Sequence, residues 1–260
     1  MSVVVFSSTG CIRCAIVKSY LSECNIEYKE FDIKTEQGNN EFKKFYREHR
    51  KSIYRDAEGI FFPIVWNGEK ILQDAGSTLA CLIAGGALNS MIAPNNLGHG
   101  WTGGISLTRG ACGPGEAFIE VLERLKRGGL SIEILTDGFC SELLEAVLHR
   151  RLVDRLRFEV FVDPEDGAAI LELTESLRLA CMPSALPELR LFTDIAAHKA
   201  DDGSFPVPEQ IAETARFIRE ITGNGRLPYV VVNSQAATQA ANLLPYRTAA
   251  RRWQVLTEVD

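Results

Sequence analysis

Short apolar runs alternate with stretches of helical periodicity along most of the 260 residues, and this alternation constrains the fold more than any other feature of the sequence. In the first ninety residues the order is strand, helix, strand, helix, strand, strand, helix. The expected ranges are 3–8, 12–24, 26–33, 39–51, 60–66, 69–73 and 77–84. The dipeptide Asn67-Gly68 is typical of a tight turn between two strands. The pattern predicts an α/β fold for this part of the chain.

The second half of the chain repeats a simpler unit, one strand followed by one helix. Strands are expected at 104–108, 131–137, 156–162, 188–196 and 228–234, and helices at 114–127, 140–150, 165–179 and 207–220. Repeated units of this kind predict a parallel sheet with crossover helices. Five strands are too few for a complete eight-stranded barrel, so the expected fold is an open sheet or a partial (β/α) barrel.

A segment rich in Gly, Asn and Pro separates the two halves. Its composition is typical of a connection without a core of its own. The sequence therefore predicts a domain of residues 1–85, a linker of residues 86–102 and a second domain of residues 103–260.

Charge, hydropathy and cysteine content restrict the partners and the compartment. Residues 1–90 carry equal numbers of acidic and basic side chains, so the net charge of -6 falls on the remainder, which argues against a nucleic-acid surface. No apolar run is long enough to span a membrane, and the first ten residues lack the features of a secretion signal. Seven irregularly spaced cysteines do not resemble a secreted disulfide framework. We expect a cytoplasmic protein with reduced thiols and one working pair.

The working pair is the C-x-x-C sequence of Cys11 and Cys14, which lies between the first predicted strand and the first predicted helix. A helix N-terminus and the neighbouring cation of Arg13 both favour a thiolate at Cys11. Cys14 lies one turn further into the helix and is expected to be more buried, which suits a thiol that attacks a mixed disulfide on Cys11. A structural zinc site and an idle pair are the alternatives; zinc needs four ligands, and no second pair of Cys or His is nearby.

Pro63 interrupts a run that otherwise reads as a strand, "IFFPIVW". A trans proline there would remove a ladder hydrogen bond from a buried strand, so we expect a cis bond between Phe62 and Pro63.

The combination of "TGCIRC" at 9–14, Pro63 before "IVWNG" and "DAGST" at 74–78 resembles glutaredoxin and related redoxins of the thioredoxin fold, over residues 1–85. The resemblance implies that the cis proline faces the two sulfurs and that Phe62 presents its backbone to a bound thiol. It also implies a substrate-binding surface, formed by Arg13, Phe62, Pro63, Asp74, Gly76 and Ser77. No cofactor and no metal are required, and the candidate electron donors are glutathione and a reductase of the thioredoxin-reductase type.

Residues 101–234 resemble the later part of the radical S-adenosylmethionine barrel of enzymes that activate anaerobic ribonucleotide reductase and pyruvate formate-lyase. The matching stretches are "WTGGISL" (101–107), "ILTDGF" (134–139) and the segment 207–232. The three closely spaced cysteines that hold the iron-sulfur cluster of those enzymes are missing, because Cys112, Cys140 and Cys181 are far apart. The resemblance implies a degenerate domain without radical chemistry that docks on a partner. The candidates are an anaerobic ribonucleotide reductase and a complete activating enzyme.

The loop "RGACGPGE" (109–116) has two interpretations, an anion site built from backbone amides at a helix start and a tight turn that uses glycine conformations. Its Cys112 is either a single cysteine or a thiol that exchanges with Cys11. Cys140 and the remaining cysteines read as small apolar residues. The tail 235–260 either covers a sheet edge or serves a partner, and we expect it to cover its own domain.

Two main hypotheses of function follow, and a third interpretation makes the protein an iron-sulfur enzyme with scattered ligands. The first is a dithiol-disulfide oxidoreductase with Cys11 as nucleophile and Cys14 as resolving thiol, in which deletion after residue 90 spares activity on small disulfides. The second is a redox-sensing adaptor or ligand-binding protein whose second domain docks on a partner enzyme.

Overall fold

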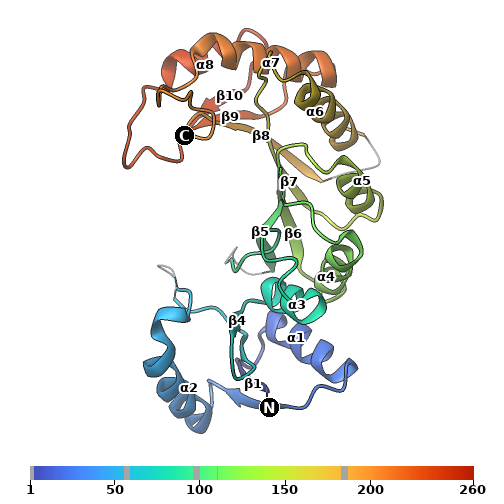
Figure 1. The fold of residues 1–260 in the computed structure, drawn as a ribbon, viewed down its shortest axis with the longest axis vertical. Helices are drawn as coiled ribbons and strands as arrows, with labels where there is room; N and C mark the ends of the chain where they lie inside the picture. The colour runs from blue at the N-terminus through green and yellow to red at the C-terminus, as the bar shows by residue number, and fades with distance from the viewer. Residues whose placement is uncertain (1–2, 56–58, 96–99, 110, 183–186) are drawn as a thin grey trace. The chain divides into compact units, whose positions relative to one another are not determined.

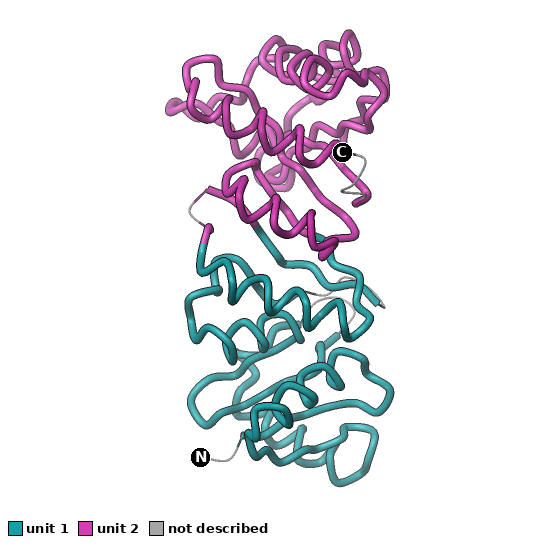
Figure 2. Tube along the Cα trace, turned by 90° about the vertical axis from the view of Figure 1, so that its right-hand side faces the viewer, with its two compact units in different colours: residues 1–106, 113–133 teal, residues 107–112, 134–260 magenta. Residues whose placement is uncertain are grey.

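The computed structural model of the protein describes residues 3–55, 59–95, 100–109, 111–182 and 187–260. Its contacts divide the chain into two compact units, which are coloured separately in Figure 2. Unit 1 contains residues 1–106 and 113–133, and unit 2 contains residues 107–112 and 134–260.

The first seven elements of unit 1 follow the predicted order (Figure 1). They are β1 (Val3–Ser7), α1 (Ile12–Glu23), β2 (Tyr28–Asp32), α2 (Glu36–His49), β3 (Ile64–Trp66), β4 (Ile71–Gln73) and α3 (Ala75–Ala84), with a short 3-10 turn at Arg50–Ser52. The strands form one sheet in the order β2-β1-β3-β4. β1 runs parallel to β2 and antiparallel to β3, and β3 is antiparallel to β4.

An aromatic core joins this sheet to α2. Phe6 on β1 contacts Phe42 and Phe45 on α2, with ring centroids 5.4 and 4.9 Å apart. Ile53 and Ile64 complete the buried cluster. The aromatic spacing of the predicted second helix therefore marks its packing face, because residues three and four apart lie on one side of a helix.

Helix α2 begins at Glu36, three residues before the predicted start. Thr35 is its N-cap, and the hydroxyl oxygen of Thr35 accepts a hydrogen bond from the amide of Gly38 at 3.0 Å. The prediction was wrong here because Gly38 and the asparagines after it have low helix propensity, and this N-cap outweighs that preference.

The predicted linker is a folded part of unit 1, which corrects the expectation that it has no core. Leu88, Met91 and Ile92 are fully buried. The amide of Ala93 donates to the carbonyl of Gly104 at 2.9 Å, so the segment pairs with β5 (Trp101–Leu107). Apolar residues spaced three and four apart within the Gly-rich composition account for this packing.

Helix α4 (Gly115–Arg127) packs in unit 1 although it lies beyond the predicted domain boundary. Its residue Arg124 forms an ion pair of 2.8 Å with Glu23 of α1 and lies over the ring of Tyr20 at 4.5 Å. Gly128, at the end of α4, lies so close to Ile16 that an added Cβ would come within 2.2 Å of that side chain. The contacts therefore place α4 with the first part of the chain, whereas the predicted boundary ended that part at residue 85.

The second sheet has six strands in the order β10-β9-β8-β7-β6-β5. Its remaining elements are β6 (Ser131–Thr136), α5 (Ser141–His149), β7 (Arg155–Glu159), α6 (Gly167–Ala180), β8 (Glu188–Asp194), α7 (Pro208–Thr222), β9 (Tyr229–Val232), α8 (Leu244–Ala250) and β10 (Thr257–Val259). The pairs β7–β8, β8–β9 and β9–β10 are parallel. Five strands were predicted; the sixth, β10, comes from the tail and covers the free edge of β9.

Strands that follow chain order across a sheet, each joined to the next by a helix, are typical of (β/α) barrels. Within unit 2, helices α5, α6 and α7 lie along one side of strands β7 to β9 (Figure 1), and each packs against the next. The sheet is consistent with a partial barrel. Among the described residues, no helix is both long enough and apolar enough to cross a membrane.

Candidate functional site

The loop between β1 and α1 is held in place from both sides. The amide of Thr9 donates to Asp32 Oδ1 at 3.3 Å, and the amide of Cys11 donates to the carbonyl of Ser8 at 3.0 Å. Gly10 adopts φ +83°, a conformation that favours glycine. This turn directs the chain so that Cys11 becomes the N-cap residue of α1.

The sulfur of Cys11 accepts a hydrogen bond of 3.2 Å from the amide of Cys14. Cys11 is half-buried, whereas Cys14 has an exposed fraction of 1%. The geometry is that expected from the spacing, since the first turn of a helix leaves its amides free to bind the N-cap side chain. Neither Cys11 nor Cys14 is part of a disulfide bond.

The surroundings of Cys11 favour its thiolate. A hydrogen bond from the Cys14 side chain lowers the pKa of Cys11 to about 6, helped by the Cys14 amide and the charge of Arg13, and burial opposes this shift. The pKa of Cys14 is raised, first by its hydrogen bond to Cys11, then by burial and the neighbouring negative charge. At neutral pH Cys11 is therefore mostly ionised and Cys14 is a thiol.

The Phe62-Pro63 peptide bond is cis, as the sequence predicted. The sulfur of Cys11 lies 3.8 Å from the carbonyl oxygen of Phe62. The ring of Phe62 packs edge-on against Phe42 of α2, with centroids 5.3 Å apart. The structure thus brings Phe62 and Pro63, two of the predicted substrate-binding residues, beside the reactive sulfur.

The other predicted binding residues lie around the start of α3. Asp74 is the N-cap of α3 and has an exposed fraction of 1%; its Oδ1 accepts the amide of Ala75 at 2.6 Å, and its own amide donates to the carbonyl of Pro63 at 3.1 Å. Gly76 is buried and Ser77 donates its hydroxyl to the carbonyl of Gln73. Asp74 and Gly76 are both buried, and the role of these residues in substrate binding stays a prediction.

Arg13 acts on two of these groups. Its guanidinium donates to the carbonyl of Trp101, and its charge lowers the pKa values of both Cys11 and Asp74. Burial is the largest influence on Asp74 and raises its pKa to about 6.

A groove of about 430 Å³ lies beside the two cysteines, with Thr9, Lys18 and Asp32 among its lining residues. Ile12, between the cysteines, is 49% exposed. Sequence reasoning did not single out this exposed aliphatic side chain next to Cys11. The sequence did carry a signal for this residue, because Ile12 is apolar and directly follows Cys11 in the C-x-x-C turn.

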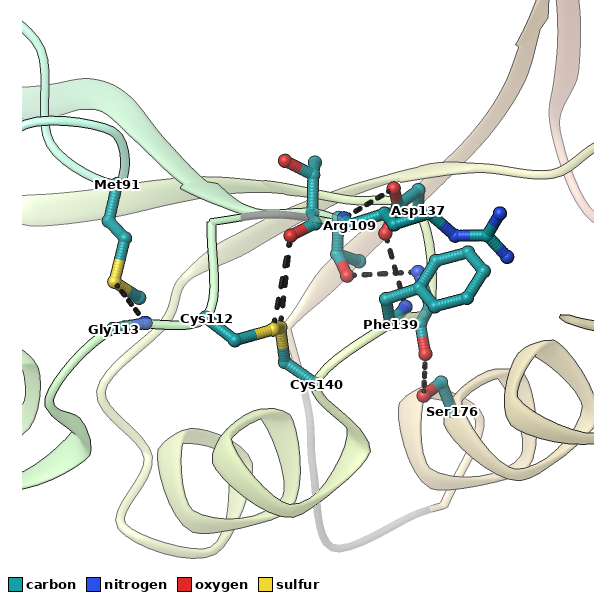
Figure 3. The surroundings of a disulfide bond; sticks show 11 residues. Met91, Arg109, Cys112, Gly113, Asp137, Phe139, Cys140 and Ser176 are labelled. Atoms are coloured by element: carbon teal, nitrogen blue, oxygen red, sulfur yellow. Dashed lines mark hydrogen bonds between the residues drawn. A yellow bond between two sulfur atoms is a disulfide. The ribbon is translucent and has the colours of Figure 1, made fainter.

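Cys112 and Cys140 form a disulfide with Cα atoms 5.9 Å apart (Figure 3). This corrects three expectations: reduced thiols with one working pair, the single cysteine at 112 and the apolar residue at 140. A separation of 28 residues hides the pairing in the sequence, and the two residues meet because they follow neighbouring strands, β5 and β6.

The tight-turn interpretation of the loop 109–116 fits the described residues better than the anion site. The amide of Arg109 donates to Asp137, that of Ala111 to the carbonyl of Thr108, and that of Gly113 to the sulfur of Met91. Gly110 lies outside the described residues. In the described part of the chain, no group of three or more His, Cys, Asp or Glu side chains is arranged to hold a metal ion.

The mixed four-stranded sheet, the cysteine pair at the N-terminus of α1 and the cis proline beside it define a thioredoxin-fold dithiol domain. Comparison with protein families agrees, because the glutaredoxin family model matches residues 3–70. This domain supports a role in thiol-disulfide oxidoreduction. Comparison with curated proteins and with solved structures returned no match.

Proposed function

We propose that the protein is a dithiol-disulfide oxidoreductase in which Cys11 attacks a disulfide and Cys14 resolves the product. The observation that carries this proposal is the hydrogen bonding at Cys11, which lowers the pKa of that thiol to about 6 and so supplies a nucleophile at neutral pH.

The reaction consists of two exchanges. The Cys11 thiolate attacks one sulfur of the substrate, a bond forms between them, and the other sulfur leaves as a thiolate that takes up a proton. Cys14 then loses its proton and attacks the sulfur of Cys11, which forms the Cys11–Cys14 disulfide and releases the second substrate thiol. Two electrons pass from the protein to the substrate.

The opposite pKa shifts order these steps. Cys14 stays protonated while Cys11 carries a negative charge, because that charge is one cause of the raised pKa of Cys14. When Cys11 enters a mixed disulfide, the charge disappears and Cys14 ionises more easily. The resolving thiol thus becomes reactive only after the first exchange.

Substrate and donor belong to the same proposal. The exposed Ile12 beside Cys11 suits a protein disulfide, for which an anaerobic ribonucleotide reductase is the first candidate, because the second half of the chain resembles its activating enzyme. Glutathione is the first donor to test, with a reductase of the thioredoxin-reductase type as the alternative. The compartment proposed is a reducing one, the cytoplasm.

The experiment compares the full chain with Cys11→Ser and Cys14→Ser in the reduction of bis(2-hydroxyethyl) disulfide by glutathione. We expect Cys11→Ser to lose at least about 100-fold in rate, since it lacks the nucleophile. The matched control is Cys24→Ser, which changes an exposed free cysteine and should retain the full rate. A Cys11→Ser variant as active as the control would refute the proposal.

Cys14→Ser also tests the partner. Without a resolving thiol, a protein attacked by Cys11 remains attached as a mixed disulfide. Incubation with purified, oxidised anaerobic ribonucleotide reductase should yield a disulfide-linked complex that dithiothreitol dissolves. Absence of that complex, from a variant that still reacts with the small disulfide, would exclude this partner.

A cavity in unit 2 favours a second candidate function, the binding of a small ligand. It has a volume of about 530 Å³ and lies where β6, β7 and β8 end, the usual ligand position in parallel sheets. His198 stacks on Phe161 at 4.1 Å and lies 3.1 Å from Glu159. Calorimetric titration of the full chain with S-adenosylmethionine tests this candidate, and an absence of heat of binding would exclude that ligand.

A further inference from the structure

The Cys112–Cys140 disulfide belongs to unit 2 and lies outside the C-x-x-C turn of Cys11 and Cys14. Cys112 lies on the segment between β5 and α4, and Cys140 lies between β6 and α5. The carbonyl oxygen of Thr108 lies 3.9 Å from Cys112 Sγ and 3.8 Å from Cys140 Sγ. The bond therefore joins the loops that follow two neighbouring strands.

The two sulfurs of this bond differ in accessibility. Cys112 is exposed, as are the neighbouring Gly113 and Pro114, whereas Cys140 is half-buried. An incoming thiolate must approach one sulfur along the line of the S–S bond and expel the other. Exposure selects Cys112 as the sulfur that is attacked and Cys140 as the leaving group.

Cys140 is also the better leaving group. It is the N-cap residue of α5, which runs over Ser141–His149. The unpaired amides and the dipole at a helix N-terminus stabilise a thiolate, and exchange is faster when the leaving thiolate is more stable. Accessibility and leaving-group stability therefore favour the same direction of attack.

The loop that carries Cys140 is anchored without the disulfide. The buried hydroxyl of Ser176 donates to the carbonyl of Gly138 at 2.6 Å. Gly138 has φ +87°, and an added Cβ there would come within 3.2 Å of Phe158 and 3.1 Å of Leu173, so the loop is tightly packed. Across the loops, the amides of Arg109 and Phe139 both donate to Asp137, at 2.8 and 3.1 Å. None of these contacts uses the two sulfurs, so they can hold the loops when the S–S bond is cleaved.

We propose that Cys112–Cys140 is a second redox-active centre, which accepts electrons from the Cys11/Cys14 dithiol of this protein. The inference rests on the proposed function, because it uses that dithiol as the reductant. An exposed bond that the fold does not depend on is typical of an exchangeable disulfide.

The exchange balances in two steps. The Cys11 thiolate attacks Cys112 Sγ; the Cys112–Cys140 bond breaks, and Cys140 leaves as a thiolate that takes up a proton. Cys14 then loses its proton and attacks Cys11 Sγ; the Cys11–Cys112 bond breaks, and Cys112 takes up a proton. The Cys112/Cys140 pair gains two electrons and the Cys11/Cys14 pair loses them. Glutathione in the assay returns Cys11 and Cys14 to thiols.

The test follows the reduction of the Cys112–Cys140 bond in the full chain. Oxidised wild type, Cys11→Ser and Cys24→Ser are treated with glutathione, quenched with acid at intervals, alkylated, and digested for mass spectrometry of the peptides that contain Cys112 and Cys140. We expect both cysteines to become alkylated at least about tenfold faster in wild type and Cys24→Ser than in Cys11→Ser. Equal rates in all three proteins would overturn the inference, as would free Cys112 and Cys140 in the oxidised wild type.

A double variant identifies the attacked sulfur. Cys14→Ser/Cys140→Ser has no resolving thiol at either centre, so its oxidised form should contain a peptide pair linked through Cys11 and Cys112. The matched control, Cys14→Ser/Cys112→Ser, should not link Cys11 to the half-buried Cys140. Circular dichroism melts of both variants establish that they are folded. Absence of the Cys11–Cys112 link from a folded variant contradicts the proposal.

The same preparations separate this inference from the proposed function. Wild type that reduces bis(2-hydroxyethyl) disulfide but does not accelerate reduction of Cys112–Cys140 overturns only the second centre. Wild type that does neither overturns both proposals.

Discussion

The amide of Cys14 donates a hydrogen bond of 3.2 Å to the sulfur of Cys11, and the Cys14 side chain donates a second one. In the proposed reaction, the resolving thiol Cys14 therefore lowers the pKa of the nucleophile Cys11, which it later attacks. One turn of helix supplies both functions, because the N-cap position and the third residue after it lie against each other.

Replacement of Cys14 should change the acidity of Cys11 in a graded way. In Cys14→Ala the side-chain hydrogen bond is lost, so the pKa of Cys11 should rise from about 6 towards its ordinary value of 9.0. In Cys14→Ser a hydroxyl can still donate, and the rise should be smaller. The measurement is the rate of alkylation of Cys11 by iodoacetamide against pH, read from the Cys11 peptide. Identical pH profiles for the two variants would contradict this assignment.

Asp74→Asn should make unit 1 less sensitive to pH. Burial raises the pKa of Asp74 from 3.8 to about 6, so between these values the folded state binds more protons than the unfolded state. The stability of the folded state accordingly falls as pH rises from about 4 to about 6. The difference corresponds to roughly 3 kcal/mol of unfolding free energy at pH 7.

The measurement for Asp74 is urea denaturation of wild type and Asp74→Asn at pH 4 and pH 7. Asparagine retains an oxygen that can accept the Ala75 amide, so the helix cap is kept. The stability gain of the variant over wild type should be larger at pH 7 than at pH 4. An equal gain at pH 4 and pH 7 would show that ionisation of Asp74 does not destabilise the folded state.

Gly38→Ala should destabilise unit 1, because an added Cβ would lie 1.9 Å from the carbonyl oxygen of Asp32. Helix α2 would have to move away from β2, at a cost of about 1 to 3 kcal/mol. Gly86→Ala is the matched control, since its Cβ would have ordinary contacts, the nearest at 3.6 Å. Urea denaturation that gives the same unfolding free energy for both variants would contradict the close approach of α2 to β2.

The fragment 1–133 should be more stable than the fragment 1–90. The shorter fragment lacks α4, whose residues Phe118, Leu122 and Leu125 are fully buried, and it loses the ion pair of Glu23 with Arg124. Exposure of the surface that α4 covers in unit 1 lowers the unfolding free energy by several kcal/mol. Thermal unfolding followed by circular dichroism provides the comparison. Equal melting temperatures would instead support a domain boundary near residue 85, as the sequence predicted.

Periodicity was sufficient to predict the order of the strands and helices, because the side chains of most elements alternate between buried and exposed positions. The position of Cys11 and Cys14 at the start of α1 was also predictable, since both residues lie on one local turn. Helix α2 starts earlier than expected because the cap at Thr35 outweighs the poor helix formers after it.

Features that depend on distant parts of the chain could not be read from the sequence. The pairing of Cys112 with Cys140 follows from the order of β5 and β6 in the sheet, and the packing of α4 against α3 from contacts across the predicted linker. The burial of Asp74 is a similar case, since the family resemblance placed this residue on a substrate-binding surface.

The most direct test of the central claim is to locate the covalent adduct that forms when Cys14→Ser reacts with bis(2-hydroxyethyl) disulfide at pH 7. The product is digested without reductant and mapped by mass spectrometry. The account predicts one 2-mercaptoethanol adduct per chain, on Cys11, because Cys11 alone combines a lowered pKa with a position at the rim of the groove. An unmodified Cys11, with the adduct on Cys24 or Cys81, would contradict it.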